Sequence, residues 1–380
     1  MKIMVLGLRG FPGVQGGIET HAEHLYPILR DLGCELEVVT RTPYCSKNQE
    51  VNELTKGIRF HPMWCPLVRG AEAFVHSFLG VLYAGLKRPD VLHIHAIGPA
   101  LFTPLAKLFG LRVVVTHHGS DYAREKWNGL AKTVLRLGER WGMGYADARI
   151  VISNVIAKDV YRMYGRDSVF IPNGVDIPGR LSDNTVVKRL ELTPQRYLVN
   201  VSRMVPEKHH LDLISAFAAS DLKGWKLVLV GNLDDNDSYC RKVIEAAQEV
   251  PGVVLAGFRT GEELKSLYAN AGIFVLPSTH EGLPIALLEA LSYGLPAIAS
   301  DIPANKEVGL PRDHYFRVGD VSDLTVCLNR IATQYRPSDY RSRLQAWVRS
   351  KYDWRQIARE TLRVYSDVVS RGFSTKASSR

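Results

Sequence analysis

Two glutamates, Glu281 and Glu289, frame the segment of this sequence whose residue types are best suited to binding a ligand. Gly282 lets the backbone approach a ligand closely, and Pro284 suits the first position of a helix. The apolar run around them predicts a helix that begins at Leu283 and ends at residue 291. The first N–H groups of a helix have no partner within it, and they carry the positive end of its dipole. The start of this helix is therefore a candidate site for an anion, and a phosphate suits it best.

Glu289 would lie about two turns further along, where its carboxylate can accept two hydrogen bonds from a cis-diol such as a ribose. A carboxylate for a sugar, a helix start for a phosphate and a carboxylate for a ribose are the parts that a nucleotide-sugar requires, in that order. Two surface glutamates on an ordinary helix have the same spacing, so the rest of the chain has to decide.

Two cations follow the predicted strand 197–201. Arg203 can hold a phosphate through its guanidinium fork, and Lys208 adds a point charge. With the helix start near Gly282 they would neutralise a diphosphate without a metal ion. The acidic run 234–237 resembles the triplet of metal-dependent transferases, but its place between a strand and a helix favours a helix cap. We therefore expect neither a metal nor a cofactor.

A pair of histidines, His117 and His118, follows the predicted strand 113–116. The carboxyl ends of parallel strands are where ligands bind, so one of the two is expected to bind a sugar hydroxyl, and the doublet leaves open which. His93 and His95 end another predicted strand. The four could suggest a metal site, but their spacing matches no strong ligand pattern, so this alternative is disfavoured.

A glycine-rich turn follows the first predicted strand and includes Gly16 and Gly17, with Glu19 in the first turn of the next helix. The spacing is not Gly-x-Gly-x-x-Gly, which disfavours a nicotinamide dehydrogenase. The glycine pair would instead direct backbone N–H groups towards an anion. The alternative is a long flexible loop.

Short apolar runs that alternate with helical patterns must position these residues. The predicted strands are residues 3–8, 36–40, 91–94, 113–116 and 150–153 in the first half, and 197–201, 227–230, 253–255, 273–276 and 297–299 in the second. Runs that are apolar on both faces and separated by helices are typical of parallel sheets covered on both sides. The sequence therefore predicts two doubly wound α/β domains, with a linker over residues 178–194. The end of the chain predicts helices over residues 340–350 and 354–370 and a disordered polar tail over residues 374–380.

The composition is that of a soluble globular protein, with 46% hydrophobic and 23% charged residues. The five cysteines are odd in number and form no Cys-x-x-Cys pair, which argues for a reducing compartment. The first apolar run is too short for a signal peptide, and no stretch is long enough to cross a membrane. We therefore expect a cytoplasmic location.

The net charge of +9 is unevenly spread. Residues 1–180 carry 22 Lys and Arg against 16 Asp and Glu, residues 341–380 carry 10 against 3, and the rest is acidic overall. A basic surface of this kind attracts anionic partners. The alternative is that the charge only favours solubility. No nucleic-acid motif is present, so nucleic acid is not an expected partner. The predicted helix 124–143 has an apolar face from Trp127 to Trp141 and a basic face with Lys132, Arg136 and Arg140, which suits either a membrane surface or packing within the domain.

Taken together, these motifs resemble the family 4 retaining glycosyltransferases of the GT-B fold, over nearly the whole chain. The matching segments, in chain order, are Gly16-Gly17, residues 171–176 with Asn173, residues 202–208, Gly257-Phe258, and Glu281 with Glu289. The start of the chain and residues 124–127 are similar to a subgroup that includes bacterial rhamnosyltransferases of polysaccharide assembly.

The resemblance implies a role for each matching residue. Glu281 would contact the donor sugar and Glu289 the ribose, and Phe258 would lie at the base-binding loop. Arg203 and Lys208 would bind the diphosphate, and His118 would line the donor-sugar site.

The resemblance also implies an activity and an architecture. Two Rossmann-like domains, residues 1–178 and 185–350, would face each other across a cleft, with a terminal helix over residues 352–371 packing back on the first. The enzyme would transfer a hexosyl or deoxyhexosyl unit, with retention and without metal, from a UDP, GDP or dTDP sugar to a saccharide or lipid-linked saccharide. The pathway would be bacterial exopolysaccharide, capsule or O-antigen synthesis, with possible contact to anionic inner-leaflet lipid. An epimerase or phosphorylase of the same fold, or a non-catalytic donor-binding scaffold, are the alternatives.

Overall fold

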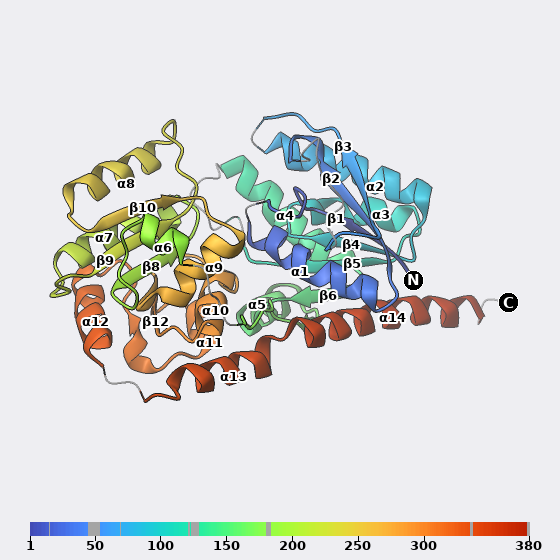
Figure 1. Cartoon of the computed structure of the whole chain (residues 1–380). Coiled ribbons are helices and arrows are strands. Elements are labelled where there is room, and N and C mark those ends of the chain that lie inside the picture. The colour runs from blue at the N-terminus through green and yellow to red at the C-terminus, as the bar shows by residue number, and fades with distance from the viewer. Residues whose placement is uncertain are drawn as a thin grey trace. The chain divides into compact units, whose positions relative to one another are not determined.

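The computed structural model describes residues 1–14, 16–44, 54–68, 70–120, 122, 129–179, 184–334 and 337–377, with side chains as far as residue 371 (Figure 1). The chain divides into two compact units, one made of Met1–Gly174 with Trp354–Arg380 and the other of Val175–Asp353.

The first unit contains a parallel sheet with strand order β3-β2-β1-β4-β5-β6-β7 in the described residues. Its strands are β1 (Lys2–Leu6), β2 (Glu35–Arg41), β3 (Ile58–Met63), β4 (Val91–His95), β5 (Val113–His117), β6 (Ala148–Val151) and β7 (Val169–Phe170). The central strands β4 and β5 are buried along their whole length, as expected for a sheet covered on both faces.

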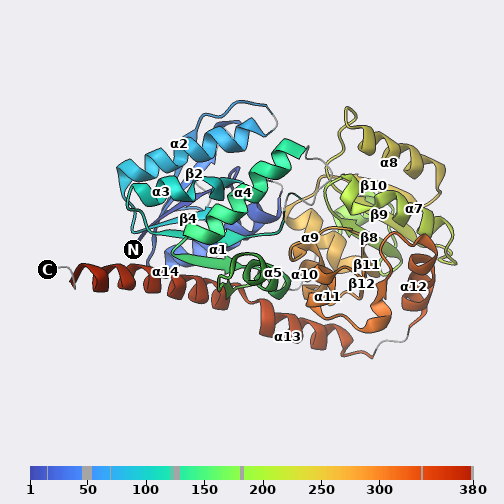
Figure 2. The same ribbon diagram turned by 180° about the vertical axis from the view of Figure 1, so that it is seen from behind.

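Helices cover both faces of this sheet (Figures 1 and 2). They are α1 (Gly17–Asp31), η1 (Thr42–Tyr44), α2 (Ala71–Lys87), η2 (Pro99–Phe102), α3 (Thr103–Leu108), α4 (Gly129–Tyr145), α5 (Asn154–Tyr164) and α14 (Trp354–Ala377). The long helix α14 packs along α1, so residues from the two ends of the chain share one core. Tyr26 and Tyr365 are fully buried in that core.

The second unit has a parallel sheet with strand order β10-β9-β8-β11-β12-β13 in the described residues. Its strands are β8 (Tyr197–Val201), β9 (Lys226–Val230), β10 (Val253–Gly257), β11 (Ile273–Leu276), β12 (Ala297–Ser300) and β13 (Tyr315–Phe316). The helices are α6 (Thr185–Arg189), η4 (Pro206–Lys208), α7 (His210–Ala218), α8 (Ser238–Glu249), α9 (Gly261–Asn270), α10 (Ile285–Ser292), α11 (Pro303–Val308), η5 (Arg312–His314), α12 (Val321–Thr333) and α13 (Tyr340–Tyr352).

All ten predicted strands are present, with ends shifted by a few residues at most. The sequence analysis missed β3, β7 and β13. The strand β3 contains Pro62 and lies at the edge of its sheet, where proline is tolerated. The other two have only two residues each, too few to show a pattern.

Three predicted boundaries were wrong. Helix α14 continues to Ala377, through part of the tail that was predicted to be disordered. Helix α6 lies inside the predicted linker, where Val186 and Val187 are buried. The helix predicted to begin at Leu283 begins at Ile285, because a residue before proline is biased away from the helical conformation.

Candidate active site

Each sheet has one point at which the chain order reverses, and ligands bind beyond the strand ends at such points in doubly wound folds. In the first unit this point lies between β1 and β4, and in the second between β8 and β11. Gly16, His118, Arg203, Lys208 and Glu281 follow the carboxyl ends of these strands or of the neighbouring β5.

In the second unit, the loops that follow β8 and β11 are joined. The Thr279 N–H donates to the carbonyl oxygen of Glu207 at 3.0 Å. Lys208 Nζ forms an ion pair with Glu281 Oε1, and their side chains are only 14% and 12% exposed. A diphosphate-binding cation and a sugar-binding carboxylate, predicted separately, are therefore direct partners.

Arg203 lies beside this pair. Its Nη2 is 3.8 Å from Oε1 of Glu207, and its side chain is about one-third exposed. The Glu207 side chain is almost fully buried. A buried carboxylate next to the guanidinium fixes one side of Arg203 and leaves part of the side chain open to solvent.

Helix α10 begins directly after the Glu281 loop. Pro284 has an extended conformation (φ −75°, ψ 103°), so it precedes the helix. The prediction that it is a helical residue was wrong. The Leu287 and Leu288 N–H groups donate to the Pro284 carbonyl oxygen at 3.1 and 3.2 Å. The first N–H groups of α10 have no partner within the helix, and they lie next to Gly282 and Leu283 in the sequence. They are therefore suited to binding an anion.

Glu289 lies on α10 and is held by a tyrosine. The Tyr268 hydroxyl donates to Glu289 Oε2 at 2.9 Å, and the Tyr268 ring stacks on that of Tyr293. Burial, followed by the nearby Glu289 carboxylate, raises the pKa of Tyr268 well above its ordinary value. Tyr268 therefore stays protonated, and its hydroxyl group orients the Glu289 carboxylate by donating a hydrogen bond to it.

Phe258 follows β10, and 41% of its surface is exposed. An aromatic side chain left in solvent at a strand end is suited to stacking on a flat ring. The acidic run 234–237 has the capping role that we predicted, since Asp237 Oδ1 accepts from the Tyr239 and Cys240 N–H groups at 2.9 and 3.0 Å.

In the first unit, Gly16 and Gly17 stand at the start of α1. Gly16 has a φ of +156°, a conformation that other residues rarely adopt, so glycine is favoured there. Glu19 is buried and pairs with Arg9 at 3.1 Å, which indicates a structural role for this glutamate. A Cβ on Gly17 meets no described atom within 4 Å, so the backbone there is open to a ligand.

The two adjacent histidines have different environments. His117 Nδ1 accepts from the Gly119 N–H at 3.1 Å, so its Nε2 carries the proton and donates to Glu139 Oε1 at 2.7 Å. Glu139 also accepts from the Tyr164 hydroxyl at 2.7 Å. Burial alone would raise the pKa of Glu139, but the hydrogen bonds from His117 and Tyr164 outweigh it and hold that pKa below its ordinary value. Both nitrogens of His117 are thus used within the protein.

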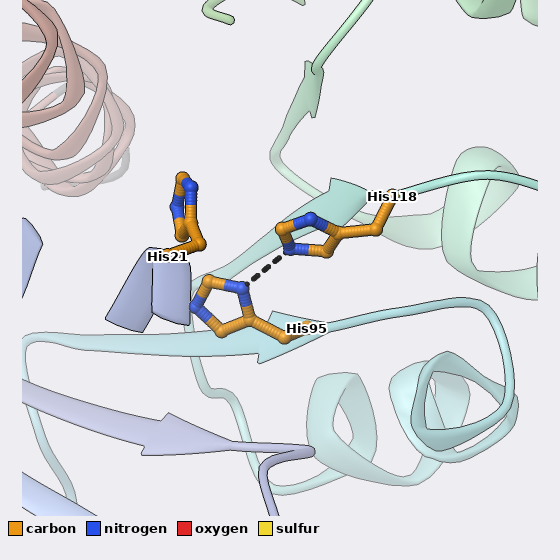
Figure 3. A group of neighbouring side chains, drawn as sticks. All are labelled: His21, His95 and His118. Carbon is orange, nitrogen blue, oxygen red and sulfur yellow. Dashed lines mark hydrogen bonds between the residues drawn. The ribbon is translucent and has the colours of Figure 1, made fainter. Parts of the chain in front are cut away.

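His118 belongs to a separate cluster with His21 and His95 (Figure 3). His118 Nε2 is 2.9 Å from His95 Nδ1, and the His21 ring meets the His118 ring edge-on at 5.1 Å. His21 Nδ1 is 3.0 Å from Oδ1 of Asn173, which is itself buried. Asn173 therefore positions His21 within this unit.

The three clustered imidazoles are neutral near pH 7. Burial, offset in part by Asn173, lowers the pKa of His21 to about 4. Burial and then the neighbouring histidines hold the pKa of His95 and of His118 well below the ordinary value.

Three ligand atoms of this cluster lie within 4.8 Å of one another, a spacing that is compatible with a metal ion. Both nitrogens of His95 are already hydrogen-bonded, however, one to His118 and the other to the Tyr26 hydroxyl. No further Cys, Asp or Glu in the described part of the chain joins the group.

His21 and Tyr26 escaped the sequence analysis. In the sequence both residues look like ordinary core positions of α1. Only the packing of α1 beside the end of β4 brings them to His95. Residues 124–127, which carried part of the subgroup resemblance, lie outside the described residues.

Residues 15–177 match the family described as Glycosyltransferase Family 4, and residues 183–315 match the one described as Glycosyl transferases group 1. The glycogen synthase of Mycobacterium tuberculosis is 25% identical over 413 residues, covering 96% of this chain and 94% of the relative. The GDP-mannose:cellobiosyl-diphosphopolyprenol alpha-mannosyltransferase of Xanthomonas oryzae is 26% identical over 314 residues, covering 75% and 76%.

Two solved structures share the fold. Sucrose-phosphate synthase from Thermosynechococcus elongatus superposes with a TM-score of 0.81 at 19% identity, covering 97% of this chain and 99% of that one. Anabaena HepE, in complex with UDP-glucose, gives 0.76 at 19% identity, covering 97% and 100%. The predicted GT-B class of two Rossmann-like domains is thereby confirmed.

Proposed function

Because the chain carries a family 4 and a group 1 glycosyltransferase domain in series, we propose that it is a retaining, metal-independent hexosyltransferase. The donor is a UDP, GDP or dTDP sugar, and the acceptor is a saccharide on a lipid carrier in bacterial polysaccharide synthesis. The observation that carries the proposal is the Lys208–Glu281 pair at the β8–β11 switch point, where a cation and a carboxylate are held together. The Xanthomonas relative is named for a nucleotide-sugar donor and a polyprenol-linked acceptor.

Departure of the nucleoside diphosphate is the step that these residues suit. Negative charge grows on the diphosphate as the glycosidic bond breaks, and preorganised donors stabilise such charge without reorganising. Arg203, Lys208 and the start of α10 beside Gly282, Leu283 and Pro284 supply those donors. The departing phosphate then takes the proton of the acceptor hydroxyl on the same face of the sugar, so the configuration is retained.

The remaining residues bind the rest of the donor. Glu289, oriented by Tyr268, accepts from the ribose hydroxyls, Glu281 contacts the sugar, and Phe258 lies against the base. Of the adjacent histidines, we assign His118 to the donor sugar, because the nitrogens of His117 are taken by Gly119 and Glu139.

We assign Gly16 and Gly17 to the donor as backbone donors at the start of α1. Glu19 and Asn173 support the site through Arg9 and His21. The start of the sequence resembles bacterial rhamnosyltransferases, so a deoxyhexose such as rhamnose belongs among the donors to be tested.

Incubation of the purified chain with a panel of nucleotide-sugars, with and without saccharide acceptors, tests the proposal. Slow donor hydrolysis without acceptor, faster transfer with acceptor, full activity in EDTA and retained configuration by NMR are expected. A strict Mg²⁺ requirement or inverted product contradicts the mechanism. An epimerised nucleotide-sugar that accumulates without acceptor indicates an epimerase, and product that forms only with inorganic phosphate indicates a phosphorylase. Binding without turnover indicates a scaffold.

A further inference from the structure

A chain of hydrogen bonds runs through the core of the first unit to His118. His95 Nδ1 is 2.9 Å from His118 Nε2, and His95 Nε2 is hydrogen-bonded to the hydroxyl of Tyr26. These groups come from three elements, since Tyr26 lies on α1, His95 ends β4 and His118 follows β5. A Cβ on Gly7, at the end of β1, would overlap the His95 carbonyl oxygen, so the absence of a side chain there lets β4 approach closely.

The chain continues from Tyr26 to the C-terminal helix. The Tyr26 and Tyr365 hydroxyls interact with each other and lie 3.0 and 2.6 Å from His93 Nδ1. His93 Nε2 is 2.7 Å from Thr116 Oγ1. His93 and His95 are fully buried, so each link is made away from water, where a hydrogen bond that is lost is not replaced.

A neutral imidazole carries one N–H, so the bonds of this chain share one direction. If the Tyr26 hydroxyl donates to His95 Nε2, then His95 Nδ1–H donates to His118 Nε2 and the proton of His118 lies on Nδ1. If every bond is reversed, His118 donates through Nε2 and its Nδ1 is an acceptor. In either direction one nitrogen of His118 is taken, and its Nδ1 has no partner among the described residues.

The geometry points to Tyr26 and His95 as positioning residues that fix the orientation and the tautomer of His118, so that its Nδ1 is presented to a hydroxyl of the donor sugar. The inference rests on the proposed function in one respect, the assignment of His118 to that sugar. The network gives His118 a neutral imidazole whose Nδ1 is a donor in one direction of the chain and an acceptor in the other. Tyr365 extends the same network to α14, so the packing of the C-terminal helix and the state of His118 are linked.

NMR of the full chain labelled with ¹⁵N-histidine tests this directly, because the ring nitrogen shifts report which nitrogen carries the proton. The signals of His118 are those lost in His118→Gln. Tyr26→Phe removes only the hydroxyl and should change the tautomer ratio of His118. Tyr83→Phe is the matched control, since the Tyr83 hydroxyl forms a similar hydrogen bond to His61 Nδ1 at 3.2 Å, outside the network of His118. It should leave the His118 signals unchanged.

Unchanged His118 signals in a folded Tyr26→Phe protein overturn the inference. If that variant does not fold, His95→Asn keeps a polar group near the position of Nδ1 and loses the bond to Tyr26, and the same two outcomes apply. If the His118 signals respond instead to removal and return of Zn²⁺, and not to Tyr26→Phe, the cluster is a metal site and the inference also fails.

Turnover separates this inference from the proposed function. Tyr26→Phe should lower kcat about tenfold with little change in KM, the scale of losing one hydrogen bond that positions a reacting complex. A changed tautomer with unchanged turnover supports the positioning chain and contradicts the assignment of His118 to the donor sugar.

Discussion

Lys208 and Glu281 are ion-paired across the two loops that follow the adjacent strands β8 and β11. Both side chains are largely withdrawn from water, so removing either one leaves the other as a poorly solvated charge. A donor that binds here meets a lysine that is already oriented. In the proposed function, the carboxylate that contacts the sugar therefore also holds the cation that meets the diphosphate.

Loss of either cation should lower the turnover of the folded protein, in addition to any stability lost because a largely buried carboxylate loses a cationic partner. Arg203→Ala and Lys208→Ala are each expected to lower turnover by about 10²- to 10³-fold, because each removes a preorganised donor for the leaving diphosphate. Lys265→Ala is the matched control, since Lys265 pairs with Glu262 at 2.8 Å in the same unit but is half exposed. Steady-state kinetics with melting curves checks this, and equal turnover in the three variants contradicts it.

The two glutamates should separate in a binding experiment. Glu289→Gln is expected to weaken binding of the free nucleoside diphosphate by roughly 10- to 100-fold, because hydrogen bonds to a charged group contribute about 1.5–3 kcal/mol. Glu281→Gln keeps a carbonyl oxygen to which Lys208 can donate, so that affinity should fall much less than in Glu289→Gln, while transfer is still impaired because Glu281 contacts the sugar. Calorimetry with the diphosphate of each base measures both. The assignment fails if the two variants lose nucleotide affinity equally.

The arrangement of the candidate residues could be predicted from the sequence more completely in the second unit than in the first. Arg203, Lys208 and Glu281 follow the ends of strands with clear apolar patterns, and Glu289 lies on the next helix, so their position followed from the fold class. The Lys208–Glu281 pairing did not follow, because the order of strands in a sheet sets which loops are neighbours.

In the first unit, the partners of His118 come from distant segments. Tyr365 lies 272 residues from His93, and its contact depends on the return of α14 to the first unit. Periodicity identifies Tyr365 only as a core position. The choice between His117 and His118 likewise depended on Glu139, which reads as a charged residue of an amphipathic helix but is buried.

Replacement of the two adjacent histidines should give opposite results. His117→Ala leaves the buried Glu139 carboxylate without one of its hydrogen-bond donors and should reduce the free energy of unfolding by about 2–3 kcal/mol. His118→Ala breaks the hydrogen bond to His95 and should cost about 1 kcal/mol of stability but at least tenfold in turnover. Urea unfolding and kinetics on both variants decide the matter, and a stable, inactive His117→Ala protein contradicts it.

Acid should destabilise the first unit. Burial lowers the pKa of His21 to about 4 and that of His93 to about 3, below the ordinary 6.5 of the unfolded chain. Between pH 6.5 and about 4 the unfolded chain therefore binds protons that the folded chain does not. The free energy of unfolding should fall as the pH falls, by up to about 1.4 kcal/mol per pH unit for each histidine. His93→Gln should flatten this slope by one proton, and an unchanged slope contradicts the prediction.

Helix α4 is expected to dock reversibly on anionic lipid through its basic residues. No helix in the described residues is both long and apolar enough to cross a bilayer. Helix α4 packs on its own unit through Gly138 and Gly142, which agrees with the interpretation that this helix packs within the domain. Arg136 and Arg140 are nevertheless exposed, and Leu130, predicted to belong to a packed apolar face, is 76% exposed.

Each basic residue near an anionic surface contributes about 1 kcal/mol, so a few suffice for weak binding within a Debye length. Co-sedimentation with liposomes should require anionic lipid, decrease in high salt, and weaken when Lys132, Arg136 and Arg140 are changed to Gln. Changing Lys188, Lys223 and Lys242 to Gln removes the same charge from exposed positions of the second unit and should have little effect. Equal loss in both triple variants would show that net charge alone is responsible. A chain that ignores anionic vesicles at low salt has no such docking surface, and the transferase proposal is unaffected.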